Sequence, residues 1–568
     1  MNPQLQSKND SLLLIIISVF ALIALSVWLA GGLAMVVAGH GWHEVGIDET
    51  LWLVIGMAKH PKNIILAWPK DKRALLGPKP IIYFAIFFVF LLMLAVFVLL
   101  RSVHTKKRSK ATGGGRIKSV SYRAQPVLNS GASWASKQDM KILLAKKDTS
   151  QRLVVGRFHS RLLSVEANHS VLLVGPSQSG KTSGLAIPAI LEWEGPIIAT
   201  SVKTDLIRDT HALRAKKGKT FVYDPTGISG LKRSSWSPLL FSRTWEGALS
   251  TAASFCQQAK TGGGGMEDAG FWYATAEKLI APLLYAAANG GCSMDDVITW
   301  IDTAEAEEPF KILESLGNNA ALRAAAASFS REDKQKSSVY TTAETVLAAF
   351  ADPIVASVSG SNDFTPADFT SGRSNTLYLV SPGHFQQRLQ SVFTAIIKTI
   401  LNHALEESCA RGKVLDPALL VVLDEAANIA PLDNLDTLAS IAAGHGVQLL
   451  TVFQDVSQIE ARYGTRWATV VNNHRAKVLC SSIADPKTLE HFSSVMGDED
   501  KDVSSHSYDK AGNWTQSISS QPKRLAPVDY LRRIRPEHAV LLYGHLPPVL
   551  MELRPFYKDK QLRALLQQ

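Results

Sequence analysis

Two long apolar runs stand near the start of the chain. Residues 12–31 form a run of twenty without a charged side chain, and residues 81–100 form another between Pro80 and Arg101. A helix rises about 1.5 Å per residue, so either run can cross roughly 30 Å of hydrocarbon. A signal peptide explains the first run poorly, because the run is too long and a second span follows. We therefore predict a membrane anchor over residues 1–110, with transmembrane helices at about 12–36 and 81–101.

Beyond residue 150 the apolar runs become short, as in strands that are buried in a sheet. Mostly apolar runs cover residues 171–174, 376–380, 419–423 and 447–453, and helical patterns separate them. This alternation predicts an α/β fold. Residues 111–150 have a mixed composition, and we read them as a linker and the start of the cytosolic part of the chain.

The run at 171–174 leads into a glycine-rich turn. Its residues fit the pattern G-x-x-x-x-G-K-[ST], which is typical of a phosphate-binding P-loop when a strand precedes it and a helix follows. Glycines let such a loop wrap around phosphate oxygens and aim backbone N–H groups at them. Lys181 would contact the β- and γ-phosphates, and the Thr182 hydroxyl would bind Mg²⁺. We predict that ATP is held by Gly175, Pro176, Ser177, Gln178, Ser179, Gly180, Lys181, Thr182 and Ser183.

A P-loop also needs a carboxylate on a neighbouring strand to hold the magnesium shell, and a group that activates water. The run at 419–423 ends at Asp424 and Glu425, and ligands collect at the ends of strands in an open α/β sheet. We predict that Asp424 binds Mg²⁺ and that Glu425 polarises the attacking water. Gln454 follows the run at 447–453 and would sense the γ-phosphate. The predicted catalytic residues are thus Lys181, Glu425 and Gln454.

The P-loop and the acidic strand are unusually far apart for two strands of one nucleotide-binding core. Lys181 and Asp424 are separated by 243 positions. Between them, alanine, leucine, glutamate and lysine are common, and these residues favour helices. We predict an all-α domain at 248–351, inserted between the two parts of a nucleotide-binding domain at 151–247 and 352–568.

The net charge of +10 is concentrated in one segment. Residues 1–100 contribute +2, and residues 101–118 contribute +7, which leaves about +1 for the remaining 450 residues. A basic segment beside an apolar span favours an anionic membrane surface and the cytoplasmic side. ATP and Mg²⁺ in the cytosol support the same orientation for the large domain. Any contact with DNA must then come from a local patch of that domain.

Further short motifs follow the P-loop in order. They are Asp224-Pro225, Trp236-Ser237-Pro238-Leu239, Phe271-Trp272, Asp352-Pro353, Asp363-Phe364, Leu423-Asp424-Glu425, Phe453-Gln454-Asp455, Tyr543-Gly544-His545-Leu546-Pro547-Pro548 and Arg554-Pro555. As a set, over roughly residues 150–560, they resemble the type IV secretion system coupling proteins, the conjugative DNA-transfer ATPase family.

The resemblance implies a RecA-like P-loop NTPase core with an inserted all-α domain and an N-terminal two-helix transmembrane anchor. It also implies a homo-hexameric ring in a bacterial inner membrane, multi-pass and with the bulk of the chain cytoplasmic. Such a ring would use ATP to feed single-stranded DNA, bound to a relaxase, into a type IV secretion channel during conjugative transfer. The all-α domain would meet the substrate or accessory proteins.

The chain departs from the family pattern at two places. Residues 201–205 are Ser-Val-Lys-Thr-Asp where the family usually has Asp-Pro-Lys-Gly-Glu, so that Lys203 is kept. Residues 442–446 are Ala-Ala-Gly-His-Gly, whereas the family often carries there an arginine that reaches into the neighbouring subunit's site. Either turnover is slow or the arginine comes from elsewhere. The candidates are Arg331, Arg462 and Arg466.

Two other functions stay open. The motor could move protein effectors, in which case DNA would not stimulate hydrolysis. The chain could also be a nucleotide-gated docking receptor with little turnover, which the missing arginine favours because such residues contribute strongly to phosphoryl transfer. Loss of hydrolysis in Glu425→Gln with nucleotide still bound would favour the enzyme.

Overall fold

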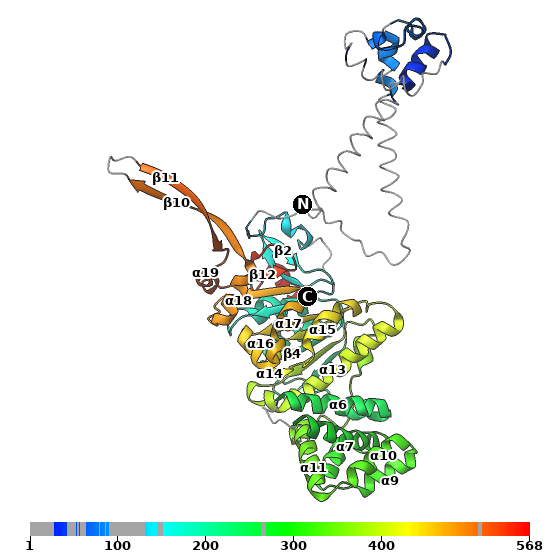
Figure 1. Ribbon diagram of the computed structural model, residues 1–568. Helices are drawn as coiled ribbons and strands as arrows, with labels where there is room; N and C mark the ends of the chain where they lie inside the picture. The colour runs from blue at the N-terminus through cyan, green and yellow to red at the C-terminus, as the bar shows by residue number, and fades with distance from the viewer. Residues whose placement is uncertain are drawn as a thin grey trace. The chain divides into compact units, whose positions relative to one another are not determined.

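The computed structural model contains two compact units, Met1–Gln125 and Pro126–Gln568. The structure describes residues 26, 28–42, 53, 56, 59, 64–78, 80–85, 87–89, 131–144, 151–262, 269–508 and 514–567 (Figure 1).

The described part of the first unit consists of short helices around a small apolar core. A helix covers residues 28–37, and two 3-10 turns follow, η1 (Ile64–Ala67) and η2 (Arg73–Leu76). Trp68 is buried in this core. Among the described residues no helix is both long enough and apolar enough to cross a membrane. Most of the two spans predicted at 12–36 and 81–101 lies outside the described residues.

The second unit is built on an eleven-stranded mixed sheet. In spatial order the strands are β2 (Arg161–Ser164), β1 (Val154–Phe158), β13 (Val549–Glu552), β12 (His538–Tyr543), β9 (Ala476–Cys480), β3 (Val171–Val174), β8 (Val447–Phe453), β7 (Leu419–Leu423), β4 (Ile197–Ser201), β6 (Thr376–Val380) and β5 (Thr220–Tyr223). Neighbouring strands from β9 to β5 are parallel, whereas β12, β13, β1 and β2 pair antiparallel. The predicted α/β class is therefore confirmed, and all four short apolar runs are strands of this sheet.

Helices follow most of the strands. They are α4 (Ile187–Glu192), α5 (Asp205–Lys217), α12 (Pro353–Ala356), α13 (Gln386–Arg411), α14 (Ala426–Ile429), α15 (Leu435–Ile441), α16 (Val456–Tyr463), α17 (Trp467–Asn473), α18 (Pro486–Met496), α19 (Val528–Arg532) and α20 (Lys560–Gln567). Together they cover both faces of the sheet, which buries the central strands β3, β4, β6, β7 and β8 along their whole length.

Side chains of each central strand alternate between two hydrophobic cores, as the pleat of a strand requires. In β3, Val171 and Leu173 join the core that contains α4 and α5. Leu172 and Val174 join the core that contains α13 and the helices near it. Burial on both faces explains why these strands appear in the sequence as continuous apolar runs.

A helical lobe lies between β5 and β6 in the sequence. Its helices are α6 (Trp245–Gly262), α7 (Ala269–Gly290), α8 (Met294–Asp302), α9 (Glu307–Leu316), α10 (Asn319–Phe329) and α11 (Asp333–Leu347). Figure 1 shows them gathered at one end of the second unit. Helix α7 contacts α6, α9, α10 and α11, and its Leu279, Ile280 and Leu283 are fully buried. The described residues between β5 and β6 contain no strand; the domain boundaries 248 and 351 stay a prediction.

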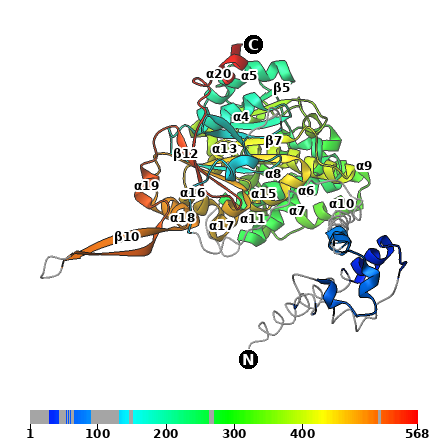
Figure 2. The same cartoon turned by 90° about the horizontal axis from the view of Figure 1, so that it is seen from above.

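The strands β10 (Asp498–Tyr508) and β11 (Trp514–Arg524) form a separate antiparallel hairpin. Figures 1 and 2 show this hairpin as an arm that extends away from the body of the unit. An isolated two-stranded ribbon is only marginally stable in water, so contacts at its base matter. One of them is the hydrogen bond from the Ala132 N–H to the Asp498 carbonyl, at 2.7 Å.

Candidate nucleotide-binding site

The predicted P-loop joins β3 to the helix that follows, and its two glycines are needed for different reasons. Gly180 has a φ of +83°, which side-chain-bearing residues rarely adopt. At Gly175 a Cβ would lie 2.6 Å from Cys480 Cβ and 2.6 Å from Ser179 Oγ, so a side chain does not fit. Gln178 lies exposed between them. The loop is therefore closely backed by the end of β9.

The helix after the P-loop begins with a widened turn. Residues Thr182–Ala186 form a π-helical turn, in which the Ile187 N–H donates to the Thr182 carbonyl five residues back. Pro188 has no N–H to give to the Gly184 carbonyl. Both the Ser183 and Gly184 carbonyls instead accept backbone N–H groups from a distant segment, those of Phe556 at 3.0 Å and Arg554 at 3.3 Å. The C-terminal segment thus completes the hydrogen bonding of the P-loop helix.

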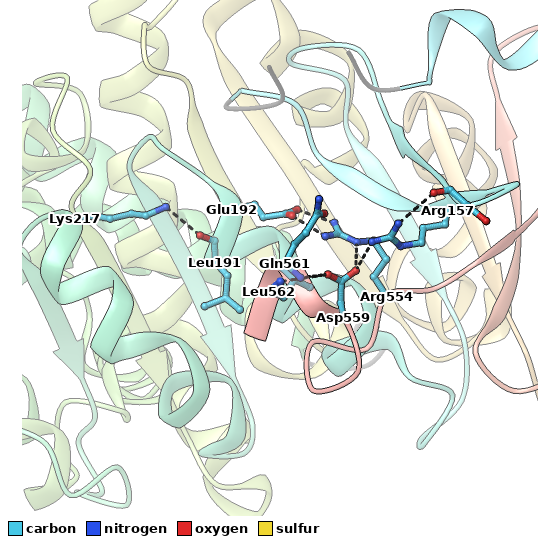
Figure 3. Close-up of polar contacts among 9 residues, drawn as sticks. Arg157, Leu191, Glu192, Lys217, Arg554, Asp559, Gln561 and Leu562 are labelled. Atoms are coloured by element: carbon cyan, nitrogen blue, oxygen red, sulfur yellow. Dashed lines mark hydrogen bonds and ion pairs between the residues drawn. The ribbon is translucent and has the colours of Figure 1, made fainter. Parts of the chain in front are cut away.

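Side chains reinforce the same junction, as Figure 3 shows. Arg554 is buried and donates to both carboxylate oxygens of Glu192 in α4, at 2.8 and 2.9 Å. Its Nε donates to Asp559 at 3.0 Å, and Arg157 of β1 donates to the same carboxylate at 2.9 Å. Burial alone would raise the pKa of Asp559, but the hydrogen bonds from Arg157 and Arg554 hold that pKa at about 2. The network therefore remains ionised at neutral pH.

The acidic strand end meets the P-loop directly. Thr182 Oγ1 donates a hydrogen bond of 3.0 Å to Asp424 Oδ2, so the two predicted magnesium ligands lie together. Thr200 of β4 donates to the Asp424 carbonyl at 3.1 Å and fixes the backbone. Asp424 is buried, which raises its pKa to about 6, although the hydrogen bond from Thr182 acts in the opposite direction. The prediction that these residues share one site is consistent with this contact.

Lys181 lies at the centre of the loop. Its ammonium donates to the carbonyls of Gly175 and Pro176, at 2.5 and 2.6 Å. Burial lowers the pKa of Lys181, while the charges of Asp424 and Glu425 act to raise it. The lysine is thus held in place by backbone oxygens and faces the acidic strand end.

One detail of the predicted arrangement is wrong. The acidic strand β7 is not the direct neighbour of β3, because β8 lies between them. Gln454 follows β8 directly, and the P-loop touches that strand through a 3.1 Å hydrogen bond from the Gly175 N–H to the Phe453 carbonyl. The Gln454 N–H in turn donates to Gln458 Oε1 at 2.9 Å. The insertion of β8 brings Gln454 beside the loop, as its predicted role requires.

Glu425 adopts a backbone conformation that is unusual for a residue with a side chain. Its φ and ψ are 55° and 51°, in the left-handed region, and it precedes the short helix α14. Such a conformation costs of order 1 kcal/mol or more and often marks a functional position. Its carboxylate is 3.5 Å from the amide nitrogen of Asn428. The strain is consistent with a side chain that must be aimed at one point.

Two residues beside the site were not predicted. Lys203 and Asp205 follow β4, which pairs with β7 so that Thr200 lies opposite Leu423. The positive charge of Lys203 acts to lower the pKa of Lys181, and the negative charge of Asp205 acts to raise that of Asp424. In the sequence they stood out only as part of the segment that departs from the family pattern.

The donor set fits a magnesium ion that is shared with a nucleotide. Within the described residues no group of three or more His, Cys, Asp or Glu side chains could hold a metal by itself. Thr182 and Asp424 offer one hydroxyl and one carboxylate oxygen, and Mg²⁺ typically takes one or two carboxylates together with phosphate oxygens and water. The site therefore matches the predicted pair of ligands, ATP and Mg²⁺.

The candidate arginines lie on separate elements. Arg331 stands between α10 and α11, and its Nε is buried without a hydrogen-bond partner in the described part of the chain. Arg462 is in α16, and burial lowers its pKa. Arg466 forms an ion pair with Asp436 at 3.2 Å. Residues 442–445 form a 3-10 turn.

Comparison with known families decides the membership of the chain. A profile described as type IV secretory system conjugative DNA transfer matches residues 127–568. The chain belongs to the conjugative DNA transfer family. This conjugative DNA transfer chain is 24% identical to Protein VirD4 of Agrobacterium fabrum over 426 residues, which cover 72% of the chain and 61% of that relative. It is also 24% identical to Conjugal transfer protein TraG of Escherichia coli, with 67% of the chain and 66% of the relative covered. The chain thus spans about three fifths to two thirds of the length of these curated relatives.

Solved structures show the fold of this family member. The bacterial conjugative coupling protein TrwBdeltaN70, in an unbound monoclinic form, superposes with a TM-score of 0.60 at 17% identity, covering 75% of this chain and 93% of that one. The plasmid coupling protein TrwB in complex with ADP and Mg²⁺ gives a TM-score of 0.58 at 16% identity, with 75% and 94% covered. The α/β nucleotide-binding fold with a large mixed sheet is therefore shared with these coupling proteins.

Proposed function

We propose that this chain is an ATPase motor that couples relaxase-bound single-stranded DNA to a type IV secretion channel. The observation that carries the proposal is the hydrogen bond between Thr182 and Asp424. It joins the P-loop to the acidic strand end, which are 242 positions apart in the sequence, at the place where a triphosphate and its metal must meet.

Each predicted site residue has a task in hydrolysis. Lys181 would release the loop carbonyls and bind the β- and γ-phosphates. Thr182 and Asp424 would hold Mg²⁺, which when bound neutralises charge on the phosphates. Glu425 would accept a hydrogen bond from the attacking water and orient it toward the γ-phosphate. Gln454, at the end of the neighbouring strand, would respond to the presence of that phosphate.

The family membership supports DNA as the cargo, since the matched profile is described as conjugative DNA transfer. In this proposal six copies of the chain form a ring, and loss of the γ-phosphate moves loops along a central pore. The relaxase delivers the strand, and the secretion channel receives it. The relatives' names, a conjugal transfer protein and a conjugative coupling protein, agree with this role.

We also propose that residues 1–110 anchor the chain in a bacterial inner membrane. The support is in the sequence: two uncharged runs of twenty residues, followed by a basic segment. The basic segment and the cytosolic supply of ATP and Mg²⁺ favour a cytoplasmic location for the bulk of the chain.

The substitution Glu425→Gln tests the enzyme. It removes the carboxylate that orients water while it keeps the size of the side chain, so ATP hydrolysis should fall at least about a hundredfold with nucleotide still bound. Hydrolysis by the full-length chain and binding of a fluorescent ADP are the measurements. Glu344→Gln, at an exposed position in α11, is the matched control. Unchanged hydrolysis in Glu425→Gln would contradict the assignment.

The same variant separates the motor from a docking receptor, a role favoured by the absence of an arginine at residues 442–446. A motor loses DNA transfer between cells together with hydrolysis. A receptor keeps transfer. A motor for protein effectors, in contrast, would lack stimulation of hydrolysis by single-stranded DNA.

A further inference from the structure

A cluster of unpaired arginines lies just before β12. Arg532 ends α19, and Arg533 and Arg535 follow in the turn that leads to His538. Within the described part of the chain, none of these three guanidinium groups forms an ion pair or a side-chain hydrogen bond. Residues 119–568 carry a net charge of only about +1, so this is a local excess of positive charge.

Two of these arginines, Arg533 and Arg535, border a hollow of about 390 Å³, here called the α19 pocket. Its lining includes Asp529, Tyr530, Arg533, Arg535, His538 and Leu550. The Tyr530 side chain is 41% exposed and Leu550 is 37% exposed, so the pocket offers apolar surface beside its cations. The ring of Trp134 lies 5.7 Å from that of Tyr530 and supports it from one side.

The α19 pocket and the P-loop lie at the same end of nearby strands in the sheet. His538 begins β12, and the next residue, Ala539, pairs with Cys480 at the end of β9. Cys480 in turn lies directly behind Gly175. Only β9 separates β12 from β3 in the sheet.

A backbone link also joins the two sites. The Leu553 N–H donates at 2.7 Å to the carbonyl of Glu537, which lies in the sequence between the lining residues Arg535 and His538. Leu553 itself lies against the P-loop, where a Cβ at Gly184 would be 3.1 Å from Leu553 Cβ. Leu553 therefore contacts both the P-loop helix and the turn that carries Arg535.

We propose that the α19 pocket binds single-stranded DNA, with Arg533 and Arg535 on phosphates and a base stacked on Tyr530. Guanidinium groups suit phosphate oxygens, and aromatic rings stack on bases of any sequence. An acidic polypeptide would use the cations but would leave the exposed ring of Tyr530 without a stacking partner, whereas single-stranded DNA uses both. The proposal rests on the proposed function, because it names the place where the motor holds its DNA.

The arginines are tested with the double variant Arg533→Ala, Arg535→Ala in the full-length chain. Binding of a fluorescent oligothymidylate is followed by anisotropy, with a non-hydrolysable ATP analogue present, at several salt concentrations. Affinity should fall roughly tenfold or more, and the slope of log K against log salt should become shallower by about 1.4, because two phosphate contacts are lost. The matched control is Arg161→Ala, Arg373→Ala, two exposed arginines outside the α19 pocket.

The stacking contact is tested at Tyr530. Tyr530→Phe keeps the ring and should bind like the parent, whereas Tyr530→Ala should lose roughly fivefold or more in affinity with an unchanged salt slope. Thermal melting of each variant reports whether it folds.

Two results would overturn the proposal. One is unchanged oligothymidylate binding and salt slope in the folded arginine variant. The other is a folded arginine variant that loses binding of polyglutamate but keeps binding of oligothymidylate. That result would assign the pocket to an acidic protein. The proposed function fails independently, through hydrolysis that survives Glu425→Gln; in that variant DNA binding itself should persist.

Discussion

At the scale of single residues, the site depends on close approaches that leave no space for larger side chains. The P-loop can contact β8 and β9 at once only because Gly175 presents no Cβ to Cys480. The Gly175 N–H, which bonds to the Phe453 carbonyl at 3.1 Å, holds the loop at this distance. The position of Lys181 depends in turn on the loop, because its ammonium donates to the Gly175 and Pro176 carbonyls.

We therefore expect Gly175→Ala to impair nucleotide binding. The added methyl group would lie 2.6 Å from two heavy atoms, and relief of such overpacking typically costs about 1–3 kcal/mol. Affinity for ADP should fall about tenfold or more, which titration with a fluorescent analogue measures. Gly383→Ala is the control, since no heavy atom lies within 4 Å of a Cβ there. Equal affinities in the two variants would show that the loop adapts without cost.

At the scale of elements, the P-loop helix and the segment that follows β13 form one structural group. In the widened turn at Thr182–Ala186, the Ser183 and Gly184 carbonyls accept hydrogen bonds from the backbone N–H groups of Phe556 and Arg554. The Arg554 side chain then ties α4 to Asp559 through buried ion pairs. Loss of one member of a buried pair reduces the compensation of the other charge, and here Asp559 would still have its ion pair with Arg157.

Arg554→Met should accordingly lower the free energy of unfolding by about 3 kcal/mol, the lower end of the range for a broken buried pair, because buried Asp559 keeps its ion pair with Arg157. Urea unfolding followed by circular dichroism measures the change. Lys558→Met, which removes an exposed ion pair with Glu537, should change stability by less than about 1 kcal/mol. A loss in Arg554→Met no larger than in this control would contradict the importance of the network.

The network also predicts a dependence on pH. The pKa of Asp559 is depressed from 3.8 to about 2, since the hydrogen bonds from Arg157 and Arg554 outweigh the effect of burial. The native state thus binds a proton less readily than the unfolded chain, and the stabilisation present above pH 4 is lost as the pH falls from about 4 to 2. Asp559→Asn should lack this part of the acid transition in urea titrations between those values.

The sequence predicted features that depend on neighbouring residues, but not features that depend on contacts between segments far apart in the chain. The P-loop, the strand ending at Asp424 and the helices around α7 follow from short patterns of apolar residues and glycines. The position of β8 between β3 and β7 could not be predicted, because no local pattern encodes the order of strands in a sheet. The contact of Arg554 with Glu192 spans 362 positions, and only the fold brings them together. The π-helical turn was not predicted either: Pro188 is a local signal for altered hydrogen bonding, but the N–H groups that bond to the Ser183 and Gly184 carbonyls come from that distant segment.

At the scale of the whole molecule, the proposed hydrolysis calls for an arginine that stabilises charge on the transferred phosphate. Residues 442–446 hold no arginine, and Arg466 is already paired with Asp436. If a neighbouring copy supplies the missing charge, hydrolysis per chain should rise with protein concentration as oligomers form. Steady-state hydrolysis and sedimentation velocity over the same concentration range measure both quantities. Constant activity per chain across the assembly transition would show that one chain is sufficient.

The bond between the P-loop helix and the segment around Arg554 has a consequence for synthesis on the ribosome. Domains commonly begin to fold while the chain is still being made. Here Glu192 leaves the ribosome 362 positions ahead of its partner Arg554. The backbone N–H groups that bond to the Ser183 and Gly184 carbonyls belong to Phe556 and Arg554 and are translated equally late. The sheet can start to assemble earlier, but the hydrogen bonds of the P-loop helix are completed only when this late segment has emerged. We therefore expect a nascent chain stalled before residue 554 to bind a fluorescent ADP more weakly than the full-length chain.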